Sequence, residues 1–473
     1  MQLRIIETIQ QRLFMRASFE YSYRFPKIRM EEFRNIYPPE LANRFFDTLA
    51  VQKGLSKILI DVPSALLQIL FALLLLSFYH PFFIFLGVLL LIFLYLVFKF
   101  TAPWGLQTSL EESKNKYKVA HWIQEVARSI ISFKLSGNTS LAMQKNDILV
   151  AGYLRSREKH FKVLVIQFLQ MISFKVLVTL GLLVIGGVLV LNQQMNIGQF
   201  VAAEIIILLV MASVEKLILG LGSLYDVLTS LEKLGQVVDK DLESQDGYRP
   251  DFGKHLVVEL DEASYAVDAK KAPILNRVSL TIGKGDRILV QGESGAGKSS
   301  LLRLISGIIT HTSGNVYVNE HAMEGLYLNH FRANLGLSLS EEAPFEGTIR
   351  ENITFGNPDI SDADILWAME NTGLTKFLKE QPLGLDTFLF PEGKQISYTN
   401  SKKIVLARAI AKKPRLLVLE DPLDHFNEKE TDGIIDFLTN PAREWSLIVV
   451  SSNRKWEDKC QTVVRLEEGK LYK

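Results

Sequence analysis

The residue pattern that points most directly to chemistry is a glycine-rich loop in the second half of the chain. It runs from Gly292 to Ser299 and fits the pattern G-x-x-x-x-G-K-S. Glycines let main-chain N–H groups turn inward around phosphate oxygens. Lys298 supplies a positive charge for the β- and γ-phosphates, and the Ser299 hydroxyl is a ligand for Mg²⁺. The sequence therefore predicts a nucleotide site formed by Gly292, Glu293, Ser294, Gly295, Ala296, Gly297, Lys298, Ser299 and Ser300.

The segments on either side of this loop have the composition of the elements that must hold it. Residues 287–290 read as a buried strand. Residues 300–309 read as an apolar helix whose N-terminus adds its positive dipole end to the phosphate site. Further short runs rich in β-formers lie at 256–260, 416–419 and 446–450. Because such runs alternate with helical ones, we predict an α/β domain with a largely parallel sheet.

The first half of the chain is far more apolar. It has no Asp, Glu, Lys or Arg between Asp61 and Lys99, nor from Val176 to Ala203. About 20 apolar residues cross a bilayer, and His80-Pro81 and the polar residues 192–196 are natural turns. We therefore predict an all-α transmembrane domain with four spans. A buried helical hairpin of a soluble protein is the alternative, but helices in soluble cores keep a polar face. The predicted spans cover about residues 58–79, 81–101, 163–191 and 197–222.

Span four carries Glu204, Glu215 and Lys216. Charges within a span are costly and usually face a bundle interior or water. Glu204 is therefore a candidate for lining a transport pathway. The simpler explanation for Glu215 and Lys216 is that they lie near the membrane boundary and extend toward water.

The distribution of basic residues predicts the orientation in the membrane. Lys and Arg are frequent in residues 1–55 and 101–160 and are missing from both turns between spans. Both ends and the long middle connection are therefore expected in the cytoplasm. Residues 236–256 are polar, contain Gly and Pro, and read as a linker. We predict a transmembrane domain with long cytoplasmic helical extensions over 1–235 and a nucleotide-binding domain over 257–473.

Composition and charge exclude several classes of protein. The 473 residues include 53 basic and 52 acidic ones, for a net charge of +1. This balance argues against binding nucleic acid or another polyanion through bulk charge. A single cysteine, Cys460, permits no intrachain disulfide and fits a cytosolic soluble part. The chain is also too apolar to be disordered.

Together these features resemble an ABC exporter half-transporter, in which a transmembrane domain and a nucleotide-binding domain share one chain. The resemblance implies ATP and Mg²⁺ as cofactors, and a second half-transporter chain as a dimer partner. It further implies an unknown cargo moved across a lipid bilayer, and a location in the cytoplasmic membrane of a bacterium. Residues 133–137 resemble the second coupling helix, which docks on the nucleotide domain. Other matching stretches are residues 273–282, 345–353, 385–387, 406–409 and 463–470.

Carrying the family's motifs over residue by residue assigns further positions. The carboxylate associated with Mg²⁺ falls on Glu420 and the catalytic carboxylate on Asp421, where the family has Asp and then Glu. The Q-loop glutamine falls on Ser340, the switch histidine on Asn453 and the D-loop aspartate on Asn427. The LSGGQ signature loses both glycines and falls on Ile396, Ser397, Tyr398, Thr399 and Asn400.

These departures predict that nucleotide binding survives better than turnover. Tyr398 and Thr399 bring Cβ atoms into an approach that glycine keeps open in the family. Asn453 cannot titrate, although it can hydrogen-bond. Positioning and electrostatics carry nearly all of phosphoryl-transfer catalysis, so we expect low ATPase activity. The adenine-stacking aromatic falls on Val267, with Tyr265 two residues away as an alternative.

Three functions remain open at this level. The first is an exporter subunit that couples ATP binding and slow hydrolysis to transport. The second is a regulatory or partner subunit that binds ATP and relies on another chain for hydrolysis. The third is a soluble P-loop ATPase with an apolar helical domain, which extraction from membranes without detergent would favour.

The number of spans bears on whether the sequence is complete. Half-transporters of this family have six spans, and four are predicted here. Residues 1–55 resemble the cytoplasmic extension between the family's second and third spans, with residues 38–41 near a coupling turn. We therefore expect a longer protein whose first two spans precede Met1. The alternative is a four-span subunit that completes its bundle with a partner, and the genomic DNA upstream of the Met1 codon distinguishes the two.

Overall fold

The computed structural model describes residues 2–34, 36–268 and 272–472. The expectation that two further spans precede Met1 concerns a residue that lies outside the described ones. The chain divides into two compact units. The helical unit comprises Met1–Ile28 and Glu32–Asp241, and the sheet unit comprises Arg29–Glu31 and Leu242–Lys473.

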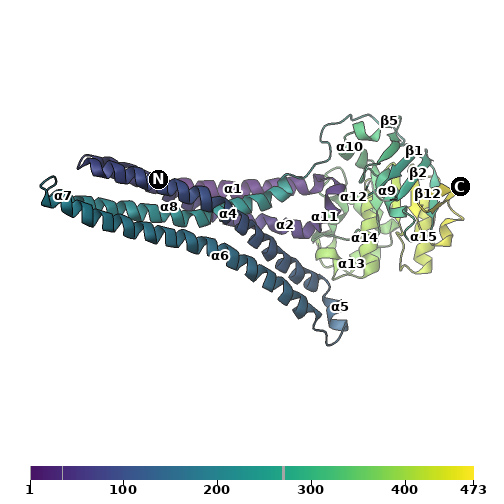
Figure 1. Cartoon of the computed structure of the whole chain (residues 1–473). Coiled ribbons are helices and arrows are strands. Elements are labelled where there is room, and N and C mark those ends of the chain that lie inside the picture. The colour runs from purple at the N-terminus through teal and green to yellow at the C-terminus, as the bar shows by residue number, and fades with distance from the viewer. Residues whose placement is uncertain (1, 35, 269–271, 473) are drawn as a thin grey trace. The chain divides into compact units, whose positions relative to one another are not determined.

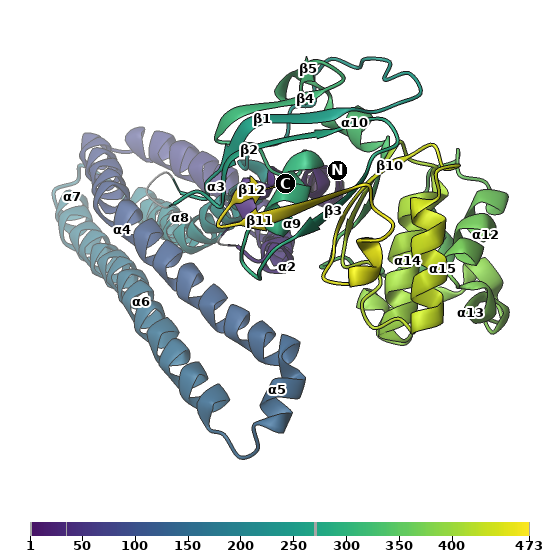
Figure 2. The same cartoon turned by 90° about the vertical axis from the view of Figure 1, so that its right-hand side faces the viewer.

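The sheet unit is built around a six-stranded sheet, which Figures 1 and 2 show from two directions. The strand order is β12-β11-β3-β10-β9-β6. All neighbours are parallel except β11 and β12, which pair antiparallel. The prediction of a largely parallel sheet is therefore confirmed. The strands are β3 (Arg287–Gln291), β6 (Leu335–Ser338), β9 (Leu416–Glu420), β10 (Ser446–Val450), β11 (Thr462–Glu467) and β12 (Lys470–Tyr472).

A second sheet is antiparallel and has the order β2-β1-β4-β5. The sequence did not reveal it as a separate sheet, because residues 256–260 were expected to join the parallel one. A short pair, β7-β8, completes the strands. Their bounds are β1 (Val258–Tyr265), β2 (Leu275–Ile282), β4 (Ser313–Val318), β5 (His321–Ala322), β7 (Gly347–Thr348) and β8 (Phe388–Leu389).

Helices cover both faces of the six-stranded sheet. Alternate strand residues face opposite sides, so Ile288 packs in the core cluster that includes α9, whereas Leu289 packs in the cluster that includes α14 and α15. Figure 2 shows α14 beside α15 and α12. The helices are α9 (Lys298–Ile305), α10 (Leu328–Arg332), α11 (Ile349–Thr354), α12 (Asp362–Asn371), α13 (Thr375–Lys379), α14 (Tyr398–Ala411) and α15 (Glu428–Thr439).

The helical unit contains four helical segments that are long and apolar enough to cross a membrane, counted over the described residues. They confirm the predicted four-span domain. The elements are α1 (Gln2–Arg24), η1 (Phe25–Lys27), η2 (Met30–Phe33), α2 (Pro38–Ala42), η3 (Asn43–Phe46), α3 (Asp47–Ser77), α4 (Pro81–Arg128), α5 (Ile130–Leu135), α6 (Leu141–Gly181), the π-helical η4 (Leu182–Gly186), α7 (Gly187–Leu191) and α8 (Ile197–Val238).

Local chemistry explains where the long helices begin. His80 caps α4 by accepting the N–H of Phe82 at 3.2 Å, and Pro81 occupies the first helical position. Asn196 and Gln199 form a capping box at the start of α8. The helix predicted over 163–191 is interrupted by the π segment η4, which hydropathy could not indicate. Within that segment Gly186 lies against Phe200, whose ring atom would be 2.6 Å from a Cβ at this position.

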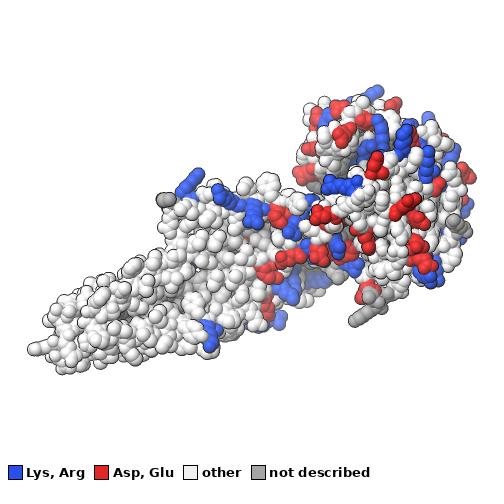
Figure 3. Space-filling model, turned by 90° about the horizontal axis from the view of Figure 1, so that it is seen from above, with Lys and Arg blue, Asp and Glu red and all other residues white. Residues whose placement is uncertain are grey.

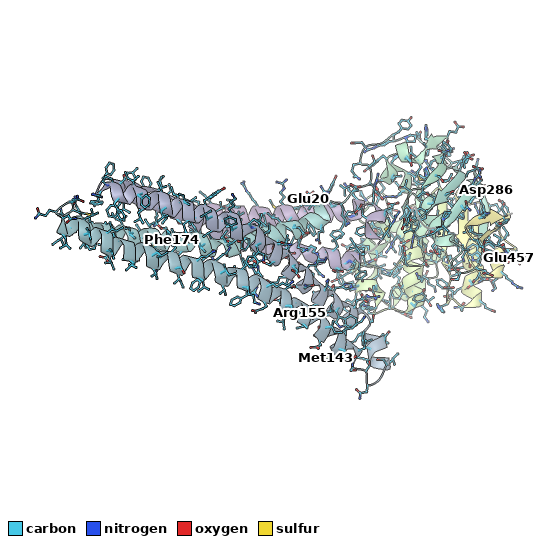
Figure 4. The ribbon with its side chains drawn as sticks, in the orientation of Figure 1. Glu20, Met143, Arg155, Phe174, Asp286 and Glu457 are labelled. Atoms are coloured by element: carbon cyan, nitrogen blue, oxygen red, sulfur yellow. The ribbon has the colours of Figure 1, made fainter. Side chains whose placement is uncertain are left out.

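Along the predicted spans the surface of the helical unit is apolar, and its interior is apolar apart from a few buried polar side chains such as Gln167 and Ser213. On the face that Figure 3 shows, the helices lack charged side chains toward the turn between α7 and α8. Phe71 and Phe85, both within the predicted spans, are exposed. Inside, Phe93 stacks on Phe174 with ring centroids 3.9 Å apart. Figure 4 labels Phe174 within the apolar part of α6 and Arg155 nearer to α5.

Candidate nucleotide site

The phosphate loop, residues 292–299, connects the buried strand β3 to α9. Gly292 has φ 153° and Gly297 has φ 103°. A Cβ on Gly292 would lie 2.2 Å from the carbonyl oxygen of Leu466, and one on Gly297 would lie 2.8 Å from that of Ile274. Glycine is therefore required at both positions by backbone conformation and by space. The loop is held in the strand–loop–helix setting that the sequence suggested.

Lys298 and Ser299 begin α9, at the helix end where the dipole favours anions. The Lys298 ammonium donates to the carbonyl oxygens of Gly292 and Glu293, each at 2.8 Å. It therefore closes the loop on itself and holds a positive charge beside it. The predicted helix 300–309 begins earlier, at Lys298, and ends earlier, at Ile305, because Gly307 adopts φ 65° just after it.

The two carboxylates assigned by resemblance lie at the end of β9. Glu420 is 8% exposed and accepts the hydroxyl of Ser299. Its second carboxylate oxygen accepts the Ser340 hydroxyl at 3.0 Å and the Ser340 N–H at 3.2 Å. The structure therefore brings together Ser299, Glu420 and Ser340, which are far apart in the sequence.

Asp421 follows in a left-handed conformation with φ 40°, and its N–H donates to Val450 at 2.8 Å. Burial raises the pKa of the Asp421 carboxyl, and the negative charges of Asp424 and Glu420 add to this effect. Hydrogen bonds from Ser451 and from the main chain of Ser452 act in the opposite direction on that pKa. A carboxylate with a raised pKa is a stronger proton acceptor, which suits the orientation of a water molecule.

The donor atoms around Ser299 fit Mg²⁺. They are hydroxyl and carboxylate oxygens, which hard divalent cations prefer. Over the described residues, no group of three or more His, Cys, Asp or Glu side chains gathers as a metal site. The side chains that would hold Mg²⁺ here are Ser299 and Glu420, which contact each other.

Two of the signature positions, Tyr398 and Thr399, contact the loop that follows Asp421. Ser397 caps α14 by accepting the N–H of Asn400 at 3.2 Å. The Tyr398 ring packs edge-on against His425, with centroids 5.4 Å apart, and Thr399 donates to the His425 carbonyl at 3.5 Å. Tyr398 is 53% exposed, so a bulky ring stands at the position where the family has its first glycine.

The remaining assigned positions have local partners. The Asn453 side chain accepts the N–H of Lys455 at 3.0 Å, and the Asn453 N–H donates to Ser451 at 3.2 Å. Asn453 is thus connected to Asp421 through Ser451. Asn427 caps α15 by accepting the N–H of Glu430 at 2.8 Å. Tyr265 is 6% exposed and packs in the core of the sheet unit, so its ring offers no open face for adenine.

One residue of this region was not identified from the sequence. Lys402 lies in the first turns of α14 and is 7% exposed. Its ammonium donates to the main-chain carbonyl oxygens of Ser340 and Glu342. The only signal in the sequence is a pair of lysines at the start of an apolar helical run, and such a pair usually lies on a solvated surface.

The fold and the loop define the class of this protein: a P-loop nucleotide-binding domain joined in one chain to a four-span membrane domain. The ABC transporter family matches residues 275–424, and the ABC transporter transmembrane region matches residues 27–214. The chain belongs to the ABC transporters, with the membrane region and the nucleotide-binding domain fused in one chain as in a half-transporter.

Individual relatives agree with this assignment. The structure of a bacterial Atm1-family ABC exporter with ATP bound has a TM-score of 0.89 and 16% identity, over 99% of this chain and 82% of that chain. The cyclolysin secretion/processing ATP-binding protein of Bordetella pertussis is 27% identical over 62% of this chain and 41% of its own length. A Staphylococcus aureus protein named for multidrug export is 25% identical over 50% of this chain. The chain spans about two-fifths of the length of these curated relatives.

Proposed function

We propose that this chain is the ATP-binding subunit of an ABC exporter and couples ATP binding, with slow hydrolysis, to transport of an unknown cargo. The observation that carries the proposal is the phosphate loop, with Lys298 and Ser299 at the start of α9 and Glu420 bonded to Ser299. Main-chain N–H groups of residues 292–300 and the Lys298 ammonium would bind the phosphates. Mg²⁺, held by Ser299 and Glu420, would supply positive charge against the β- and γ-phosphate oxygens.

Slow hydrolysis is inferred from the groups around the γ-phosphate position. Asp421 and Glu420 retain carboxylates, but Ser340 and Asn453 provide shorter or non-titrating side chains than the family's residues. Tyr398, packed on His425, would crowd the phosphate of an opposing subunit. Since positioning supplies most of the catalysis in phosphoryl transfer, we expect these changes to affect turnover more than binding.

Two surfaces support a dimer with a second half-transporter chain. On the helical unit, α5 exposes Ile131 and Leu135, which are 70% and 82% accessible. On the sheet unit, a groove of about 860 Å³ is lined by both apolar and charged side chains, and its apolar part includes Leu337, Ile353 and Phe355. An exposed apolar helix is complementary in chemistry to the apolar part of this groove. We infer that α5 of one chain docks on the nucleotide domain of the other and passes domain closure to the spans.

The exposed apolar surface of the spans supports an integral membrane protein. We infer a location in the cytoplasmic membrane of a bacterium, with the nucleotide-binding domain in the cytoplasm. The relatives named for secretion and for multidrug export carry different cargoes in their names. The cargo of this chain is therefore left open.

The nucleotide site is tested with the Lys298→Ala variant. Hydrogen bonds to charged groups contribute about 1.5–3 kcal/mol, and about 1.4 kcal/mol corresponds to tenfold in affinity. We therefore expect Lys298→Ala to weaken ATP binding roughly tenfold or more in the purified full chain. Lys284→Ala, at an exposed lysine of the same domain, is the matched control and should bind like the wild type. Equal ATP affinity in Lys298→Ala and the wild type would refute the site.

The packing of Tyr398 on His425 favours a second candidate, a hydrolysis-deficient regulatory or heterodimer partner subunit. Such a chain would bind ATP and rely on the partner for turnover. Phosphate release by the purified chain in lipid separates the two functions. Slow but measurable release favours the exporter subunit acting with its own copy, and release only after addition of a second half-transporter favours the partner subunit.

A further inference from the structure

Lys402, a buried lysine of α14, donates hydrogen bonds to main-chain carbonyl oxygens of residues 340–342. Ser340 of this segment in turn hydrogen-bonds the carboxylate of Glu420. Lys402 is 7% exposed, and its ammonium donates to the Glu342 carbonyl at 3.1 Å and to the Ser340 carbonyl. The Glu342 and Ser340 carbonyls lie 60 and 62 residues away in sequence, respectively, on the segment just after β6. Lys402 therefore connects the first turns of α14 to residues 340–342.

The same segment makes the next contact toward the phosphate loop. Ser340 donates both its hydroxyl and its N–H to one carboxylate oxygen of Glu420, at 3.0 and 3.2 Å. The other oxygen of Glu420 accepts the Ser299 hydroxyl. A continuous chain of hydrogen bonds thus runs from Lys402 through Ser340 and Glu420 to Ser299.

The length of the Glu420 side chain makes this arrangement specific. Glutamate carries one methylene more than aspartate, and with that reach its carboxylate spans Ser299 on one side and Ser340 on the other. Ser340 donates to this carboxylate through both its hydroxyl and its N–H, and so fixes the orientation of the glutamate. The position of the carboxylate therefore depends on where residues 340–342 are held.

A buried ammonium is costly unless it is bound. Burial lowers the pKa of Lys402, and the negative charges of Glu342, Asp424 and Glu420 act against that shift. Its direct partners are carbonyl oxygens of one short segment, so its binding energy acts on the position of that segment. The ammonium also lies 5.6 Å from the ring centroid of Tyr398, at the start of the helix.

Lys403 provides a contrast on the same helix. It is also buried, but its ammonium pairs with the Glu430 carboxylate at 2.6 Å and donates to the Gly373 carbonyl at 3.4 Å. These contacts join α14 to α15 and to the end of α12. Two adjacent buried lysines therefore serve different parts of the domain.

We propose that Lys402 is a positioning residue for the metal side of the nucleotide site, which it serves by fixing residues 340–342 and, through Ser340, the carboxylate of Glu420 beside Ser299. The inference rests on the proposed nucleotide site. It predicts that loss of the Lys402 ammonium reduces the gain in ATP affinity that the metal provides. The affinity for ATP without metal should stay the same.

The test measures ATP affinity of the full chain in lipid nanodiscs, once in EDTA and once in excess Mn²⁺. The ratio of the two affinities reports the contribution of the metal. Residues that orient metal ligands typically affect metal affinity about 10–100-fold. We expect Lys402→Met to lower the ratio roughly tenfold or more and to leave the affinity in EDTA unchanged. The Mn²⁺ electron paramagnetic resonance spectrum of the bound complex should change as well.

Lys403→Met is the matched control, because it removes an equally buried ammonium one position along the same helix. It should leave the ratio at the wild-type value. If both variants lower the ratio alike, or if Lys402→Met leaves it unchanged, the inference is wrong. Wild-type protein that binds no ATP in either condition overturns the proposed nucleotide site itself, which is a different failure.

A second variant covers the case in which Lys402→Met does not fold. Ser340→Ala removes the hydroxyl that reaches Glu420 but no buried charge. It should lower the ratio in the same direction, again without an effect in EDTA. In the double variant the two losses should not add, because both act through one carboxylate. Additive losses, or an unchanged ratio in Ser340→Ala, would contradict the proposed chain of contacts.

Discussion

At the scale of single residues, the proposed hydrolysis would depend on where the carboxylates of Glu420 and Asp421 stand relative to an attacking water. Asp421 is held by main-chain and serine contacts, and burial raises its pKa. The direction of this shift makes the Asp421 carboxylate a stronger proton acceptor. Asp421 is therefore the residue on which the remaining turnover is expected to depend.

We predict that Asp421→Asn abolishes the remaining ATPase activity. The amide cannot accept a proton, and a positioned base typically contributes about 10²–10⁴-fold to rate. Phosphate release by the protein in lipid is the measurement. Asp432→Asn is the control, since Asp432 is exposed and pairs with Lys455 on the surface. Brisk turnover that survives Asp421→Asn would show that another group activates the water.

The companion substitution Asn453→His is expected to restore little activity. Histidine would add a titrating group next to Ser451, which bonds both Asn453 and the Asp421 carboxyl. The signature positions would remain altered, because Tyr398 still packs on His425. A large gain in turnover from this single change would mean that the signature loop is not limiting.

The residue scale also shows what the sequence could indicate. The phosphate loop was recognisable because its chemistry is local: eight consecutive residues carry the glycines, the lysine and the hydroxyl. The role of Lys402 could not be recognised from the sequence, because its hydrogen-bond partners lie about 60 residues away and reach it only in the folded domain. Tyr265 was considered as an adenine platform, yet the strand pattern of β1 buries it.

At the scale of elements, hydropathy predicted the four membrane helices, because these depend on composition over long stretches. Where each helix begins and ends is set by caps and packing, which hydropathy does not report. α3 begins at Asp47 and α6 at Leu141, so both helices extend beyond the predicted spans. The predicted strand at 256–260 belongs to an antiparallel sheet, because it pairs with β2 and β4, and the composition of residues 256–260 does not indicate these pairings.

Close packing between α4 and α8 gives a prediction for the helical unit. A Cβ on Gly105 would lie 2.4 Å from the ring of Tyr225. Tyr225 is 1% exposed, and its hydroxyl accepts the Gln167 amide at 2.8 Å, so the ring has little room to move. We expect Gly105→Ala to destabilise the unit by about 1–3 kcal/mol through overpacking. Thermal unfolding in lipid nanodiscs is the measurement.

The matched control is Gly152→Ala on α6, where an added Cβ meets nothing within 4 Å. Replacing glycine by alanine on an open helix surface is expected to stabilise by up to about 1 kcal/mol. The two substitutions are chemically identical and should shift the melting temperature in opposite directions. Equal shifts would mean that helix propensity, and not contact with Tyr225, controls the effect.

At the scale of the whole molecule, the distribution of charge along the helical unit predicts its orientation in the membrane. The turns after α3 and α7 lack Lys and Arg, whereas the segments around α5 carry several, including Lys134, Lys145 and Arg155. Basic connections remain on the cytoplasmic side. The turn at residues 192–196 should therefore face the outside, and the turn at residues 136–140 should face the cytoplasm.

Cysteine labelling tests this orientation with little background. The single natural cysteine, Cys460, is 9% exposed, and burial raises the pKa of its thiol to about 11. Its thiol therefore reacts slowly with maleimides. Cys460→Ala removes the remaining background. In that background, Gln194→Cys should react with a membrane-impermeant maleimide on intact cells. Asn138→Cys, also exposed, should react only after permeabilisation. The opposite labelling pattern would mean that the topology is inverted. The nucleotide domain would then lie outside the cell, where no ATP is available. That result would contradict both the predicted orientation and the proposed exporter function.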